Sequence, residues 1–181
     1  MSASSERAHF ALMARYNGWM NEKIYTAAAR LPASEFAAER RAFFGSLAGT
    51  LHHLILTDTI WLQRFAAHPV RFQTLDGARR LPAPSALTQA SPPPLAAMWE
   101  TRQMLDSLIG EWVKELREEH LDQTLHYRRM NGEAGAKRLG HVIAHFFNHQ
   151  THHRGQASTL LFQAGVDIGP TDLLMLIADV E

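Results

Sequence analysis

The first regular hydrophobic pattern in the chain lies between about Glu6 and Leu31. Apolar residues recur there in alternating steps of three and four, which is the spacing of one face of an α-helix. The helix should end at Leu31, because a residue before proline is driven out of the helical region of backbone space. Only Asn17 interrupts the stripe, which comprises Phe10, Met13, Asn17, Met20, Ile24, Ala27 and Leu31.

Two further patterns predict long helices in the middle of the chain. The segment from about Ser46 to Ala67 is apolar around most of its circumference, so we expect a largely buried helix. The segment from Leu95 to Leu116 carries a strict stripe that only Arg102 interrupts. That arginine could extend toward solvent or pair with an acidic residue.

The connections between the helices have their own signals. Residues 69–94 contain six prolines and no sustained period, which predicts a long crossover that runs over the surface. Residues 124–137 contain the turn dipeptide Asn131-Gly132 and predict a short hairpin or an irregular loop.

The end of the chain predicts a fourth long helix over about residues 137–163, stopped by Gly165. A short last helix is expected to start near Thr171 and Asp172. The chain is therefore predicted to be a single all-α domain, residues 1–181. Its architecture would be a four-helix bundle of the up-down-down-up type with one long crossover.

Composition narrows the function. Eighteen basic residues balance eighteen acidic ones without long blocks of either sign, which disfavours nucleic acid and anionic membranes as partners. The chain has no cysteine, so disulfides and thiolate ligands are excluded and any thiol must come from a partner molecule. No leader-like or membrane-spanning run is apparent, so a cytoplasmic protein is expected. The unusual feature is eleven histidines, five of them between positions 141 and 153.

Helical geometry separates two of those five histidines from the others. The inward stripe of the fourth helix passes through His149 and His153, whereas His141, His145 and His152 are turned toward its flank. Residues four apart lie one turn apart on one face, so both rings can reach one ion. Two buried core histidines are the alternative, but each ring would then need partners for both nitrogens. Metal ligation is therefore favoured. The stripe comprises Val142, Phe146, His149, His153, Ala157, Leu160 and Ala164.

A third ligand should come from another helix, and His52 and His53 are the obvious donors. His53 shares a narrow polar strip with Ser46, Thr50 and Thr57, which could line a site or face water. Spacing alone does not decide between the two histidines.

Three stretches resemble the signatures of the DinB-like metal-binding helical bundles. They are the run from His53 to Leu62 (HLILTDTIWL), residues 148–156 (NHQTHHRGQ) and residues 16–21 (YNGWMN). The stretches span nearly the whole chain in the family's order. The resemblance implies a four-helix bundle, often a homodimer, that holds zinc or nickel.

Carried over by position, the resemblance implies that the metal ligands are His53, His149 and His153, with His52 a neighbouring nonligand. Three ligands leave one coordination position open, which is typical of catalytic rather than structural sites. Relatives in the wider superfamily use low-molecular-weight thiols. The main functional hypothesis is therefore metal-dependent activation of a thiol for transfer, with hydrolysis by activated water as the nearest rival. A noncatalytic, stress-associated metal-binding protein is the alternative.

Other residues within these signatures have two interpretations each. Asp58 could orient a ligand, but pairing with an arginine such as Arg154 is the preferred interpretation. Trp61 is expected in the core rather than on a substrate surface. Asn148 and Gln156 could be capping groups or outer partners of the ligands. No role is assigned to His52, His145 or His152.

Overall fold

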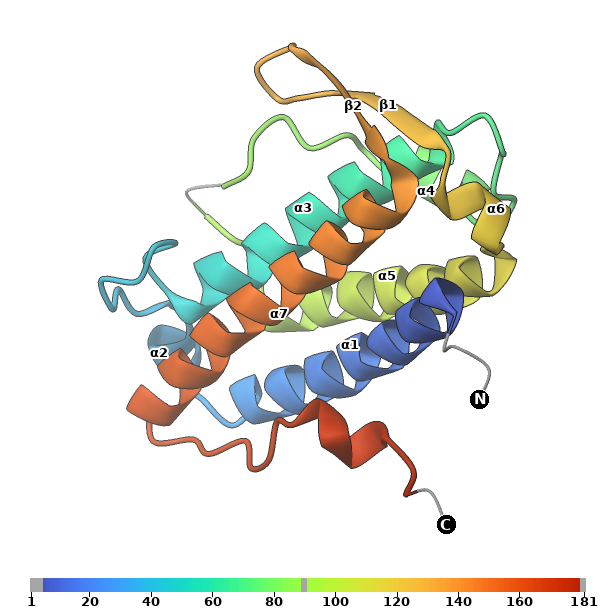
Figure 1. Cartoon of the computed structure of the whole chain (residues 1–181). Helices are drawn as coiled ribbons and strands as arrows, with labels where there is room; N and C mark the ends of the chain where they lie inside the picture. Colours follow the sequence, from blue (N-terminus) through green and yellow to red (C-terminus); the bar gives the residue numbers. More distant parts are fainter. Residues whose placement is uncertain (1–4, 89–90, 180–181) are drawn as a thin grey trace.

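The computed structural model describes residues 5–88 and 91–179. The chain is mostly helical with one small sheet (Figure 1). The long helices are α1 (Glu6–Ala28), α3 (Leu47–Ala66), α5 (Leu95–Glu115) and α7 (Leu139–Gln163). The shorter elements are α2 (Ala33–Ala37), α4 (Asp76–Arg79), α6 (Glu118–Leu121), strands β1 (Thr124–Arg128) and β2 (Ala134–Arg138), and the 3-10 helix η1 (Leu173–Leu176). No helix within these described ranges is long and apolar enough to cross a membrane.

The four long helices begin and end close to the predicted residues. Ser5 and Ser46 cap α1 and α3, each accepting a hydrogen bond from the backbone N–H three residues later, at 3.1 and 3.0 Å. Helix α1 ends at Ala28, three residues before the predicted Leu31, because the backbone tightens there into i→i+3 hydrogen bonds before the proline. Gly165, with φ of 80°, follows α7 in the left-handed conformation that glycine adopts readily.

The long helices pack side by side, with α1 and α3 each contacting both α5 and α7. Helices α1 and α7 run in one direction and α3 and α5 in the other, so the connection between α3 and α5 must return along the whole helix length (Figure 1). The predicted stripes face inward. Their buried members include Phe10, Met20 and Ile24 of α1, Leu105, Ile109 and Trp112 of α5, and Val142, Phe146 and Leu160 of α7.

A buried ionic network crosses this core. Arg102 Nη1 donates to Asp58 Oδ2 at 2.5 Å, and Arg102 Nη2 lies 3.0 Å from Asp106 Oδ1. The side chains of Arg102 and Asp58 are 2% and 1% exposed. Asp58 therefore pairs with an arginine, as predicted. The arginine is Arg102 and not Arg154, which donates to Asn17 instead. Arg102 lies on the inward stripe of α5 and reaches Asp58 of α3. The pattern of a single helix does not show which helix lies beside it, so the sequence could not identify Arg102 as the partner of Asp58.

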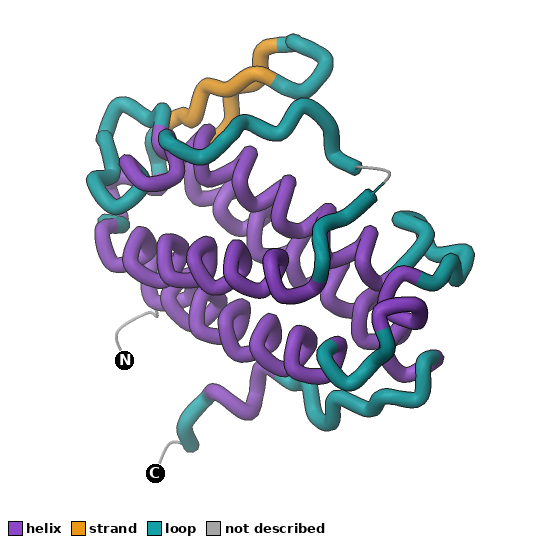
Figure 2. Tube along the Cα trace, turned by 180° about the vertical axis from the view of Figure 1, so that it is seen from behind, coloured by secondary structure: helices purple, strands orange, loops and turns teal. Residues whose placement is uncertain are grey.

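The crossover between α3 and α5 was expected to run over the surface, which is wrong for its first half. Phe72, Leu75 and Ala78 are buried, and the Phe72 ring packs 5.9 Å from that of Trp112. These three residues are spaced three apart, but the pattern covers only seven residues and part of the single turn of α4. A pattern this short does not stand out in the sequence as a helical period. The part of the crossover that follows α4, up to residue 88, runs beside the hairpin (Figures 1 and 2).

The hairpin prediction is confirmed. Strands β1 and β2 pair antiparallel from Thr124↔Arg138 to Arg128↔Ala134. Gly132, with φ of 85°, supplies the left-handed turn residue. Gly135 lies opposite Tyr127, where an added Cβ would be 2.6 Å from the ring, so glycine lets that ring lie flat against the strand.

The last predicted helix is a 3-10 helix, η1, and the Asp172 side chain does not cap it. The tail is tied to α1 by two side chains. Tyr16 Oη donates to the Thr171 carbonyl at 2.7 Å, and Lys23 Nζ donates to the Pro170 carbonyl at 2.5 Å. These contacts hold the tail against α1.

Candidate metal centre

The structure brings His53, His149 and His153 together from two antiparallel helices, α3 and α7. His149 Nε2 lies 3.3 Å from His53 Nε2 and 3.1 Å from His153 Nε2. All three ligand atoms lie within 4.8 Å of one another, and no other group of three such residues occurs in the described ranges. The two α7 histidines meet because they are one turn apart, and His53 approaches them because α3 packs against α7.

These distances fit one metal ion. Nitrogens that each lie about 2.0–2.1 Å from a tetrahedral zinc are about 3.3–3.4 Å apart. The separations involving His149 are close to that value. Three neutral imidazoles are also a donor set that zinc and nickel accept readily. The three histidines can therefore hold a divalent transition metal.

Two outer hydrogen bonds direct the ring nitrogens inward. His53 Nδ1 lies 2.8 Å from the Leu87 carbonyl oxygen, and His153 Nδ1 lies 2.7 Å from Gln156 Oε1. Both oxygens can only accept, so each Nδ1 carries the proton and donates it. In the neutral rings, each Nε2 then keeps its lone pair for the shared centre. This is the outer arrangement found around metal-binding histidines.

Electrostatics favour the neutral rings. Burial lowers the pKa of His53 and His153 below the ordinary histidine value of 6.5. The pKa of His149 falls to about 3, first because of burial and then because His153 and His53 are so close. At neutral pH, protons therefore do not compete with a metal for the lone pairs of the three ring nitrogens.

Phe44 closes one side of the group. Its ring stacks on His53 with centroids 3.9 Å apart and meets His153 edge-on at 5.3 Å. Phe44 comes from the loop before α3, whose Arg41 adopts a φ of 55°. This apolar cover lowers the local dielectric and excludes water from that side.

The remaining histidines lie outside the group. His52 is buried and is not part of the group. His152 is exposed; its ring lies 4.8 Å from that of His153, and Gln156 Nε2 makes a long contact of 3.4 Å with it. The ring of His145 lies 6.0 Å from that of His149 and 5.5 Å from that of Trp61.

A cavity of about 470 Å³ adjoins the group, and Phe44 is not among its described lining residues. His53 and His149 form one end of it. Trp61, expected in the core, is half-buried and forms a wall together with Tyr127 of the hairpin. The other lining residues are Thr57, Ile60, Arg64, Leu87, Arg129, Met130, Asn131 and His145. A bound metal would thus face a space large enough for a small molecule.

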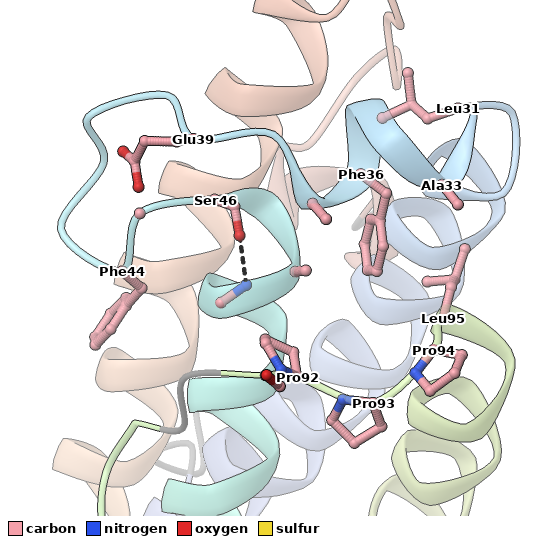
Figure 3. Close-up of a pocket in the computed structure, with 15 residues that line it drawn as sticks. Leu31, Ala33, Phe36, Glu39, Phe44, Ser46, Pro92, Pro93, Pro94 and Leu95 are labelled. Atoms are coloured by element: carbon pink, nitrogen blue, oxygen red, sulfur yellow. Dashed lines mark hydrogen bonds between the residues drawn. The ribbon is translucent and has the colours of Figure 1, made fainter.

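A larger cavity of about 690 Å³ lies near the start of α3 (Figure 3). Prolines 92–94, Phe36 and Leu95 make its lining mostly apolar, and Glu39 is its one titratable side chain. Phe44 separates it from His53. Because no histidine of the group lines it, the smaller cavity is the one that offers chemistry.

Replacing Gln156 with leucine tests whether its hydrogen bond to His153 Nδ1 supports metal binding. Loss of the acceptor for His153 Nδ1 leaves that ring free to turn, so metal affinity should fall by roughly 10–100-fold in a competition titration with a chelator. Asn148→Ala is the control, because Asn148 is exposed on the same helix and should leave affinity unchanged. Equal affinities for Gln156→Leu and wild type would remove Gln156 from the site.

Acid should destabilise the metal-free protein. Since the folded pKa values of the three histidines lie below 6.5, the unfolded chain binds more protons as the pH falls below that value. The free energy of unfolding in excess chelator should therefore drop between about pH 7 and about pH 5. His149→Gln should show a smaller drop. Identical pH dependence in the two proteins would contradict the lowered pKa of His149.

These features define a mostly helical protein in which a three-histidine group able to hold a metal ion lies beside a small-molecule cavity. The chain belongs to the DinB family, whose model matches residues 1–179. It is similar to Protein DinB of Bacillus subtilis (strain 168), with 26% identity over 157 residues that cover 87% of each chain. No solved structure gives a significant match. The resemblance found in the sequence is therefore confirmed at the level of the family.

Proposed function

We propose that this DinB-family protein is a metal-dependent enzyme whose centre is one zinc or nickel ion held by the Nε2 atoms of His53, His149 and His153. The four long helices would act as a four-helix bundle that fixes these side chains. The observation that carries the proposal is the convergence of three Nε2 atoms, two of them from histidines that line a cavity. A metal needed only for stability would more often have four protein ligands and no adjoining space.

The proposed reaction is transfer of a small thiol to an electrophile. A divalent metal in such a site lowers the pKa of a coordinated thiol or water. The thiol sulfur forms a bond to an electrophilic carbon, the bond from that carbon to its leaving group breaks, and the thiol proton passes to solvent. The chain's own residues would orient the thiol against Trp61 and Tyr127 and exclude water with Phe44.

Thiol transfer is preferred over hydrolysis because of the cavity lining. A hydrolase needs a general acid or base beside the attacked bond, a role that histidine fills most often and carboxylates also fill. His145 is the one histidine of the described lining outside the metal group, and its ring packs against Trp61 with centroids 5.5 Å apart. The described residues that line the cavity include no aspartate or glutamate. A thiol, once deprotonated, needs no such base.

A thiol screen tests the proposal. Zinc-loaded, nickel-loaded and chelator-treated protein would be incubated with low-molecular-weight thiols and a chlorinated aromatic electrophile, and product would be measured by chromatography. We expect metal-dependent product with at least one thiol and none from His149→Ala. If chelation unfolds the chain and no thiol or ester is turned over in any metal state, a noncatalytic metal-binding protein is the better account.

A further inference from the structure

The cavity has a second polar end, formed by Arg64. Helix α3 lines the cavity along one face through His53, Thr57, Trp61 and Arg64. Arg64 lies eleven residues after His53, so its Cα is about 16 Å further along the helix axis. The Arg64 guanidinium lies over the ring of Trp61, three residues earlier on the helix, so this side chain runs back toward His53. The distance between guanidinium and histidine group is then on the order of 10 Å.

Aromatic rings hold the Arg64 guanidinium in place. It lies 4.5 Å from the ring centroid of Trp61 and 5.1 Å from that of Tyr127. Nη2 also donates to the backbone carbonyl of Arg128 at 2.8 Å. A guanidinium stacked on two rings is fixed in orientation, and its remaining N–H donors keep the planar fork that matches a carboxylate.

Arg64 has no carboxylate partner in the described part of the chain. Burial lowers its pKa; Tyr127 offsets part of this effect, and no carboxylate contributes. The second arginine of the lining, Arg129, differs because Glu133 pairs with it at 2.8 Å. An arginine that is half-buried and uncompensated is costly unless a ligand supplies the missing charge.

We propose that Arg64 is the anion-binding group of this cavity and that it binds a carboxylate of the substrate. This inference rests on the proposed function, since it places the reactive end of the same molecule at the three histidines. The substrate class is then a small molecule with a thiol at one end and a carboxylate about 10 Å away, with an apolar middle against Trp61 and Tyr127. Arg64 acts here as a specificity-determining residue.

Arg64 also joins α3 to the hairpin through Arg128, and the test must separate this clamping role from anion binding. A clamp shapes the cavity for every ligand and would change the affinity of charged and neutral molecules together. An anion-binding group changes only the affinity of the charged one. Matched ligands that differ only in a terminal group therefore discriminate between the two roles.

The experiment compares 8-mercaptooctanoate with 8-mercaptooctanol on the cobalt-loaded protein. Calorimetry measures each affinity, and the visible cobalt spectrum reports independently whether the thiol reaches the metal. We expect the acid to bind wild type at least about tenfold more tightly than the alcohol, as one charge-assisted bidentate pair allows. Arg64→Gln should reduce that ratio to near one, Arg64→Lys should keep part of it, and Arg129→Gln should keep it whole.

Two results overturn the inference: equal affinity of the acid and the alcohol for wild type, or an acid preference that survives Arg64→Gln. Absence of measurable binding of either ligand also overturns it. Failure of the proposed function has a different signature, namely an acid preference that depends on Arg64 while the cobalt spectrum stays unchanged. In that case the cavity binds anions but the thiol does not reach the metal.

Discussion

His149→Ala is expected to abolish stoichiometric metal binding. His149 Nε2 is the atom closest to both other ligands, at 3.3 Å from His53 and 3.1 Å from His153, so its loss removes the centre of the group. Two imidazoles rarely hold a divalent metal at micromolar concentration. The affinity should fall by more than the roughly 10–100-fold that loss of an outer partner costs. A competition titration with a fluorescent zinc chelator measures this difference.

His52→Ala is the matched control, because His52 lies on the same helix as His53 and is similarly buried, at 5% and 6% exposure. Its metal affinity should equal that of wild type, whereas His53→Ala and His153→Ala should lose affinity as His149→Ala does. Full affinity in His53→Ala together with loss in His52→Ala would show that the other α3 histidine is the ligand.

Arg102→Met is expected to destabilise the fold by about 3–5 kcal/mol, which is the usual cost of removing one partner from a buried ion pair. Asp58 would remain buried without its nearest cation, although burial already raises its pKa and Gln150 still donates to it at 2.8 Å. Methionine has nearly the volume of arginine without its charge, so the loss reports mainly on electrostatics. Urea unfolding in excess chelator measures it.

The exposed pair Lys114–Glu111 provides the comparison. Its side chains are 67% and 58% exposed, so Lys114→Met should cost no more than about 1 kcal/mol. The double variant Asp58→Leu/Arg102→Met should recover much of the stability lost in Arg102→Met, because no charge of that pair is then stranded. A loss in Arg102→Met as small as that in Lys114→Met would mean that the network contributes little.

The sequence predicted those features that depend on periodicity. Positions of the long helices followed from stripes, and the inward placement of His149 and His153 followed from the stripe of one helix. The same reasoning could not separate His52 from His53, because α3 is buried on nearly every side and both histidines are buried. Only the family resemblance pointed to His53.

Other parts of the site lacked any sequence signal. The Leu87 carbonyl that orients His53 belongs to a backbone group, which carries no side-chain signature. Phe44 and Tyr127 reach the site from a loop and a hairpin, whose placement depends on tertiary packing. The partnership of Asp58 with Arg102 likewise needed the order of helices around the core, and intrahelical spacing gives no information on that order.

X-ray absorption at the metal edge is the most direct test of whether His53, His149 and His153 bind a metal ion. Protein purified with its native metal and dialysed against metal-free buffer would be measured without further loading. We expect one metal per chain with three nitrogen ligands at about 2.0–2.1 Å and the outer-shell scattering of imidazole rings, and we expect that scattering to be weaker in His149→Ala. A shell of oxygen ligands without imidazole scattering, or a spectrum identical in His149→Ala, would contradict this expectation.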